Sequence, residues 1–279
     1  MTPALLGLAA LAGLLIGLSL GALGGGGSVL AVPVLVYALG QSPGQATTGS
    51  LVVVGLTSLI GAVTAKRSGN LMLGRGVTFG VVAIGGATLG AKASALVPGP
   101  VLMAAFAILL LVVATVMLLR QVEARRAAGH GKQPPARAQL DDPIITFSPH
   151  FACACPRALK VLITATVVGL LTGFLGVGGG FLVVPALVLA LGLPMGLAAG
   201  TSLVVITITS AAALVVRAGT ATHPDWALVG LLTVFAILGG HLGARLACRV
   251  STDRLQTAFT TLLLLVAGYT AAHAVPALL

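Results

Sequence analysis

The sequence predicts an all-α polytopic membrane protein made of two inverted repeats of about five hydrophobic segments each. Three observations lead to this class. Of 279 residues, 58% are hydrophobic and 7% are charged, whereas an ordinary globular domain carries about a quarter charged residues. Ten apolar stretches follow one another along the chain, and part of the first half recurs in the second half. Because such a chain cannot cover a water-soluble surface, the bilayer is its expected solvent.

Each apolar stretch is a predicted helix, because a helix satisfies its own backbone groups in lipid. In the first half the stretches cover residues 3–23, 29–39, 47–65, 76–97 and 101–119. In the second half they cover residues 159–175, 181–191, 197–216, 226–247 and 255–275. The intervening residues are rich in charge and proline, which is typical of a solvated linker. The chain therefore divides into a first transmembrane repeat (1–119), a cytoplasmic linker (120–158) and a second transmembrane repeat (159–279).

An internal repeat relates the two halves. Residues 17–40 align without a gap on residues 169–192 at an offset of 152, and 15 of the 24 positions are identical. The shared positions include Pro33 with Pro185, which a bias toward leucine and glycine does not explain. With small gaps the match continues and pairs Arg67 with Arg217.

The distribution of cations predicts the orientation. Thirteen of the fifteen Lys and Arg residues lie in the linker with its flanks, in the turn after the third segment, or in the last turn. The positive-inside rule places these three regions in the cytoplasm and both termini outside. The third and eighth segments then run in opposite directions, so the repeats are inverted, which is typical of secondary transporters.

Two short apolar segments, each preceded by a glycine-rich turn, are the main candidate site. Residues 29–39 would form roughly 16 Å of helix, too short for a hydrocarbon core of roughly 30 Å, and residues 181–191 are equally short. Helices that begin after such turns present unpaired N–H groups and a positive dipole end, which bind anions. The two turns, from inverted halves, are predicted to meet near the membrane midplane. The alternative is that the glycines only let helices pack closely. The predicted anion-binding turn residues are Gly24, Gly25, Gly26, Gly27, Ser28, Gly176, Gly178, Gly179 and Gly180.

Hydroxyl groups open the third and eighth segments at matching places. Thr48, Ser50, Thr201 and Ser202 are predicted to replace water around the anion, or to cap the helices, and the two roles are compatible. Cations near the membrane could draw an anion into vestibules or act as interface anchors. These cations are Lys66, Arg67, Lys92, Arg217 and Arg245, of which Arg67 and Arg217 are the preferred vestibule residues because the repeat pairs them.

The linker contains a C-x-C motif. His150, Cys153 and Cys155 are weak candidates for a metal site or a redox switch, and a cysteine pair without function is an equal alternative.

The residue types missing from the apolar segments limit the possible functions. No Asp or Glu falls inside an apolar segment, which argues against a metal-cation permease or an intramembrane aspartyl protease. Uniport, channel-like flux or proton movement with the substrate remain, with His241 and His273 as weak proton-carrying candidates.

The glycine motifs resemble the TauE/SafE family of sulfite exporters. The resemblance rests on GALGGGGSVLAVPVLV and TGFLGVGGGFLVVPALV, on Gly200-Thr201-Ser202 and on residues 217–226, and it covers both halves without the linker. It implies a multi-pass permease of the bacterial or archaeal inner membrane for sulfite, organosulfonates or related anions, acting in export. The order Thr48-Gly49-Ser50 in the first half and the C-x-C linker depart from the family pattern.

These observations predict a secondary transporter and no enzyme, with no catalytic residue and no cofactor. The expected partners are a small anionic substrate and the lipid bilayer, not nucleic acid, and homodimerisation is left open. A membrane-embedded thiol-relay or sensor protein that uses Cys153 and Cys155 is the alternative.

Overall fold

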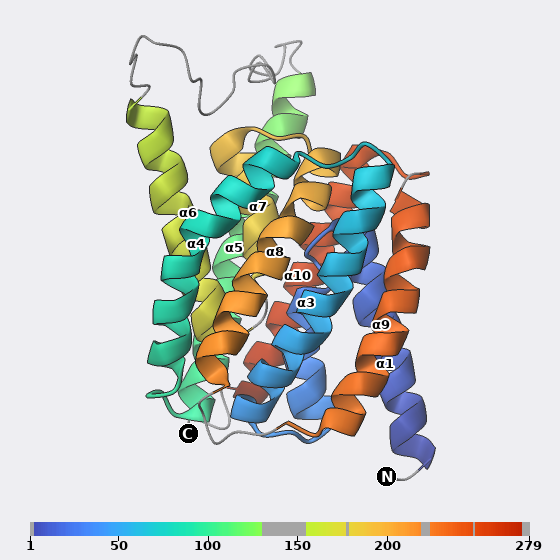
Figure 1. The fold of residues 1–279 in the computed structure, drawn as a ribbon. Coiled ribbons are helices and arrows are strands. Elements are labelled where there is room, and N and C mark those ends of the chain that lie inside the picture. The colour runs from blue at the N-terminus through green and yellow to red at the C-terminus, as the bar shows by residue number, and fades with distance from the viewer. Residues whose placement is uncertain (1–2, 130–154, 177–178, 219–223, 248, 275–279) are drawn as a thin grey trace.

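The computed structural model describes residues 3–129, 155–176, 179–218, 224–247 and 249–274. Regular structure in these ranges is entirely helical and forms one bundle (Figure 1). The first half contains α1 (Pro3–Leu23), α2 (Ser28–Pro33), the π-helix η1 (Val34–Ala38), α3 (Pro43–Arg67), α4 (Leu73–Ser94) and α5 (Gly99–Gly129). The second half contains α6 (Cys155–Leu175), α7 (Gly180–Leu191), α8 (Met195–Arg217), α9 (Trp226–Ala247) and α10 (Thr252–Ala274).

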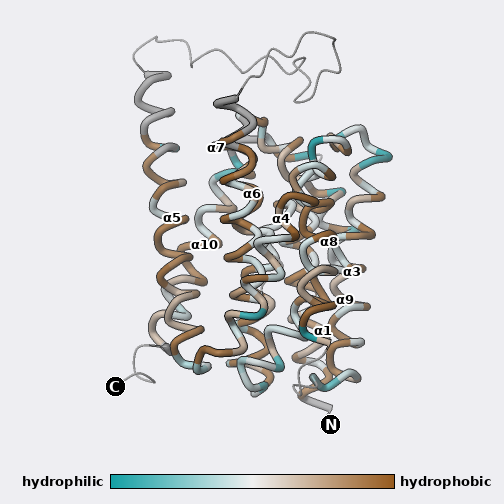
Figure 2. The backbone as a smooth tube through the Cα atoms, turned by 60° about the vertical axis from the view of Figure 1, so that its left-hand side comes forward, coloured by the Kyte–Doolittle hydropathy of each residue, from teal (hydrophilic) through white to brown (hydrophobic). Residues whose placement is uncertain are grey.

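The outer surface of the bundle is suited to lipid. Among the described residues, seven helices are long and apolar enough to cross a membrane. Hydrophobic residues dominate these helices along their length (Figure 2). Large side chains such as Leu89 and Ile108 are more than 60% exposed, which in water would cost free energy and in a bilayer does not. The predicted all-α membrane class is confirmed.

Several helix boundaries differ from those of the predicted segments, and α3 and α5 show the reason most clearly. α3 begins at Pro43 because Ser42 and Gln45 form a capping box, in which the Ser42 hydroxyl accepts from the Gln45 N–H and the Gln45 side chain accepts from the Ser42 N–H. α5 continues to Gly129, beyond the boundary predicted at residue 119. In this extension the Gln121 side-chain amide donates to the Thr260 hydroxyl of α10 at 2.8 Å.

Helix pairing follows the repeat. α1 packs along α9, and their counterparts α6 and α4 pack along each other, while α3 packs on α8 and α5 on α10. A Cβ atom at Gly17 of α1 would overlap the Ala236 carbonyl of α9, and a Cβ atom at Gly173 of α6 would overlap the Ala87 carbonyl of α4. In Figure 1 α3 runs upward while α8 runs downward. The two helices therefore run in opposite directions, and the inversion of the complete repeats stays a prediction.

The bundle has two distinct ends, which we name the linker face and the terminal face. At the linker face α5 ends, α6 begins, and short connections join α3 to α4 and α9 to α10; at the terminal face α1 begins and α10 ends (Figure 1). The cations of both short connections lie at the linker face, whereas Lys92 and Arg217 lie at the helix ends of the terminal face. This separation is the charge distribution on which the predicted orientation depends.

Candidate functional site

The two glycine-rich turns lie against each other inside the bundle. One turn joins α1 to α2 and the other joins α6 to α7, and their described glycines are buried. A Cβ atom at Gly25 would overlap the backbone of Gly180, so the turns touch directly. The sequence predicted that they meet, while their role in binding an anion stays a prediction. Gly178 lies outside the described residues.

Glycine is required in these turns by conformation and by space. Gly24, Gly176 and Gly179 have φ angles of 71°, 64° and 65°, which side chains with a Cβ atom rarely adopt. At Gly27, a Cβ atom would overlap the Ile16 carbonyl of α1. The glycines therefore allow close packing of the helices, as the alternative interpretation of the sequence proposed. This role does not depend on whether the turns bind an anion.

Each turn is held by a serine from the opposite repeat. The Ser202 hydroxyl of α8 is shared between the Gly24 carbonyl at 3.3 Å and the Ala199 carbonyl of its own helix at 2.7 Å. The Ser50 hydroxyl of α3 is likewise shared between the Gly176 carbonyl and the Thr47 carbonyl at 2.9 Å. Both serines are fully buried and occupy matching repeat positions. The two hydrogen bonds therefore cross-link the halves of the protein around the point where the turns meet.

The other predicted hydroxyls also bind backbone groups. The Ser28 hydroxyl donates to the Gly25 carbonyl at 2.7 Å, and the Thr48 hydroxyl donates to the Gly44 carbonyl at 3.1 Å. The Thr201 hydroxyl accepts from the Met72 N–H at 3.2 Å. Thr48 and Thr201 lie inside α3 and α8, whose N-cap residues are Ser42 and Pro194, so these hydroxyls do not occupy the N-cap positions of the capping alternative.

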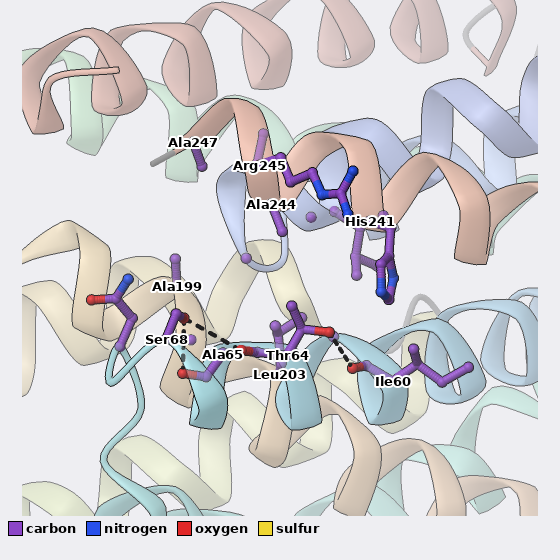
Figure 3. Close-up of a pocket in the computed structure, with 18 of the residues that line it drawn as sticks. Ile60, Thr64, Ala65, Ser68, Ala199, Leu203, His241, Ala244, Arg245 and Ala247 are labelled. Carbon is purple, nitrogen blue, oxygen red and sulfur yellow. Dashed lines mark hydrogen bonds between the residues drawn. The ribbon is translucent and has the colours of Figure 1, made fainter. Parts of the chain in front are cut away.

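A cavity of about 300 Å³ lies near the linker face, and Gly24 of the turn between α1 and α2 is one of its lining residues. Its walls come mainly from α1, α3, α8 and α9, and Leu20, Thr57 and Ile237 are the lining residues farthest from the linker-face ends of α1, α3 and α9. In Figure 3 His241 and Arg245 project from α9 on one wall, with Ile60 and Thr64 of α3 and the following residue Ser68 on the facing wall. Its polar lining residues in the described part of the chain are Thr57, Thr64, Ser68, Asn70, His241 and Arg245.

The cavity carries positive charge at its mouth. Arg245 lies in the last turn of α9, and no Asp or Glu is among the described residues that line the cavity. A cleft with one sign of charge and low-dielectric walls concentrates ions of the opposite sign. The sequence analysis listed Arg245 among the near-membrane cations but chose Arg67 and Arg217 as vestibule residues. The repeat also pairs Arg245 with Lys92, and this pairing could have identified Arg245 as a candidate.

The two preferred vestibule cations lie at opposite ends of the molecule. Arg67 is exposed at the end of α3 on the linker face and does not line the cavity. Arg217 is 8% exposed and points into the bundle near the terminal face. Its Nη1 donates to the Thr47 hydroxyl at 2.9 Å, and its Nη2 donates to the Ser94 hydroxyl at 2.6 Å and the Gly173 carbonyl at 3.3 Å.

The structure does not test the C-x-C motif. His150 and Cys153 lie outside the described residues, and Cys155 is the first residue of α6. Within the described ranges, no group of three or more His, Cys, Asp or Glu side chains could hold a metal ion.

Comparison with known proteins finds a family model and two relatives. A family model described as "Sulfite exporter TauE/SafE" matches residues 9–270. Two relatives from strains of Xylella fastidiosa, each named "Probable membrane transporter protein", are 31% and 32% identical over 260 residues. Each alignment covers 91% of this chain and 90% of the relative. No solved structure matches the chain.

Proposed function

This chain belongs to the TauE/SafE family, and on that premise we propose that it exports small sulfur-containing anions such as sulfite or organosulfonates as a secondary transporter. The observation that carries the proposal is the cavity of about 300 Å³ near the linker face, which is lined both by Arg245 and by Gly24 of the first glycine turn. Its volume is at the lower end of the range of roughly 300–1,000 Å³ typical of small-molecule sites. A small anion with part of its water shell fits such a space.

The charge of the cavity favours an anion. Arg245 at the mouth attracts negative solutes, and its planar guanidinium can donate two hydrogen bonds to one oxyanion. His241 lies one helical turn before it on the same wall (Figure 3). Thr64, Ser68 and Asn70 supply neutral polar groups along the way. A cation would find no carboxylate among the described lining residues.

The orientation of the cavity supports export. We place the linker face in the cytoplasm of a bacterial or archaeal cell, because the turn and linker cations gather there. The cavity then opens toward the cytoplasmic pool of substrate, and the terminal face lies outside the inner membrane. Alternating access by movement of one repeat against the other would carry the anion past the glycine turns.

Flux through purified protein tests this proposal. Proteoliposomes would be loaded with sulfite, sulfate, thiosulfate or a small alkylsulfonate, and a metal cation would serve as the control solute. We expect saturable efflux of at least one sulfur-containing anion and no cation flux. Cation flux would refute the anion site, and the absence of flux for every tested anion would refute the proposed substrate class.

A further inference from the structure

The buried Arg217 network near the terminal face has a counterpart at the linker face. α3 and α8 are continuous helices, so the offset of 152 that relates the glycine turns carries through them and places Ala65 opposite Arg217. Pairing Arg67 with Arg217 would require a gap inside a helix. The same offset relates Thr47 to Ala199 and Gly173 to Gly21.

The fourth member of the network follows the same rule. α4 and α9 have equal lengths of 22 residues, and the offset of 153 between them relates Ser94 to Ala247. The arginine and both of its hydroxyl partners are therefore replaced by alanine in the other half. All four counterparts, Gly21, Ala65, Ala199 and Ala247, line the open cavity.

Neighbouring positions show the same contrast. Leu51, Ala91 and Ala213 form a closed apolar cluster near the terminal face, and each is at most 2% exposed. Their counterparts at the linker face are Leu203, Ala244 and Gly61, which all line the cavity. Equivalent residues thus surround a cavity at the linker face and pack closely near the terminal face. The guanidinium of Arg217 belongs to the closely packed group.

We infer that Arg217, by joining Thr47 of α3, Ser94 of α4 and Gly173 of α6, closes the transport pathway at the terminal face. The inference rests on the proposed function, since a pathway exists only in a transporter. Its physical basis is the guanidinium fork, which donates charge-assisted hydrogen bonds to three helices from a fourth. Opening this half requires those hydrogen bonds to break, so Arg217 favours the conformation that is open at the linker face.

A cysteine reporter measures this closure without any transport assay. The three native cysteines would be changed to serine, and Ala91→Cys would be introduced into the closed cluster. In nanodiscs both faces are accessible to a water-soluble maleimide, so the labelling rate reports how often Ala91 becomes exposed. We expect slow labelling with Arg217 present, and labelling at least about tenfold faster after Arg217→Ala, because the equilibrium shifts toward opening.

Matched variants separate closure from general loosening. Lys92→Ala removes an exposed cation from the same end of α4 and should leave the Ala91→Cys rate unchanged. Ser94→Ala removes one acceptor, keeps Arg217 itself and should give a smaller increase. A second reporter, Ala244→Cys in the open cavity, should label rapidly with Arg217 and more slowly after Arg217→Ala, because the two halves open alternately.

An unchanged Ala91→Cys rate after Arg217→Ala would overturn the inference. Faster labelling of both reporters would overturn it too, because Arg217 would then stabilise the whole bundle and not one state. Neither readout depends on sulfite flux, so failure of the proposed substrate is seen separately in the proteoliposome assay.

Discussion

At the scale of single residues, the hydroxyls that bind the glycine turns are structural contacts with a measurable stability cost. Ser202→Ala would remove the hydroxyl that the buried Gly24 carbonyl shares with the Ala199 carbonyl. An unsatisfied buried acceptor costs about 1–3 kcal/mol, so we expect a lower unfolding temperature in detergent. Ser50→Ala should behave in the same way because Ser50 donates to the equivalent Gly176 carbonyl.

Ser58 provides the control for this prediction. It is fully buried in α3, yet its hydroxyl has no hydrogen-bond partner in the structure. Ser58→Ala removes no hydrogen bond and should leave the unfolding temperature unchanged or slightly raised. Equal destabilisation by Ser58→Ala and Ser202→Ala would show that the loss comes from the serine side chain in general and not from the bond to the turn.

Arg245 is the residue whose charge should matter most for substrate entry. Arg245→Ala removes the positive charge from the cavity mouth, so we expect KM for the anion to rise about tenfold, a loss of about 1.4 kcal/mol of interaction free energy. The rate at saturating anion should change less, because the residue attracts the substrate and does not form the closed state. Initial efflux rates measured over a range of anion concentrations give both constants.

Arg249→Ala is the matched variant for Arg245. Arg249 is exposed in the connection between α9 and α10 and does not line the cavity. Its removal lowers the net charge equally and should leave KM unchanged. A similar rise in KM for both variants would mean that the overall charge of the linker face, and not the cavity mouth, attracts the anion.

At the scale of helices, some glycines touch the backbone of a neighbouring helix and others face open space. Gly17→Ala places a methyl group against the α9 backbone, and we expect a loss of about 1–3 kcal/mol because backbone cannot yield as a side chain can. Gly7→Ala in the same helix meets no atom within 4 Å and should stabilise α1 through helix propensity. Thermal unfolding in one detergent compares the two, and equal effects would contradict close packing of α1 on α9.

The helices themselves were largely predictable, because apolar length and the repeat leave little freedom in a bilayer. The boundaries were less so. The capping box at Ser42 moved the start of α3 to Pro43 because polar residues can continue a helix beyond its apolar segment. α5 runs ten residues beyond residue 119, where Gln121 finds partners on α10. Hydrophobicity marks the part of a helix that lies in lipid, not the part that continues into water.

At the scale of the whole molecule, the repeat predicted that the glycine turns would meet but not which half would be open. The sequence treated Arg67 and Arg217 as equivalent, whereas one is exposed at the linker face and the other is buried near the terminal face. Two related halves have the same pattern in sequence even when one encloses a cavity and the other is filled. The difference depends on a few replaced side chains, which periodicity and composition do not reveal.

If the Arg217 network closes one half, transplanting it should close the other. The triple substitution Ala65→Arg, Ala199→Thr and Ala247→Ser rebuilds the arginine with both hydroxyl partners at the cavity of the linker face. The new guanidinium would occupy space that is open in the native protein, so we expect slower maleimide labelling of Ala244→Cys and lower anion efflux. Ala65→Arg alone lacks both hydroxyl acceptors and should close the cavity less completely, which distinguishes the hydrogen-bonded network from simple bulk. Unchanged labelling in the triple variant would mean that the linker-face cavity stays open although it carries the same three side chains as the terminal face. Arg217 and its two hydroxyl partners would then not be sufficient for closure.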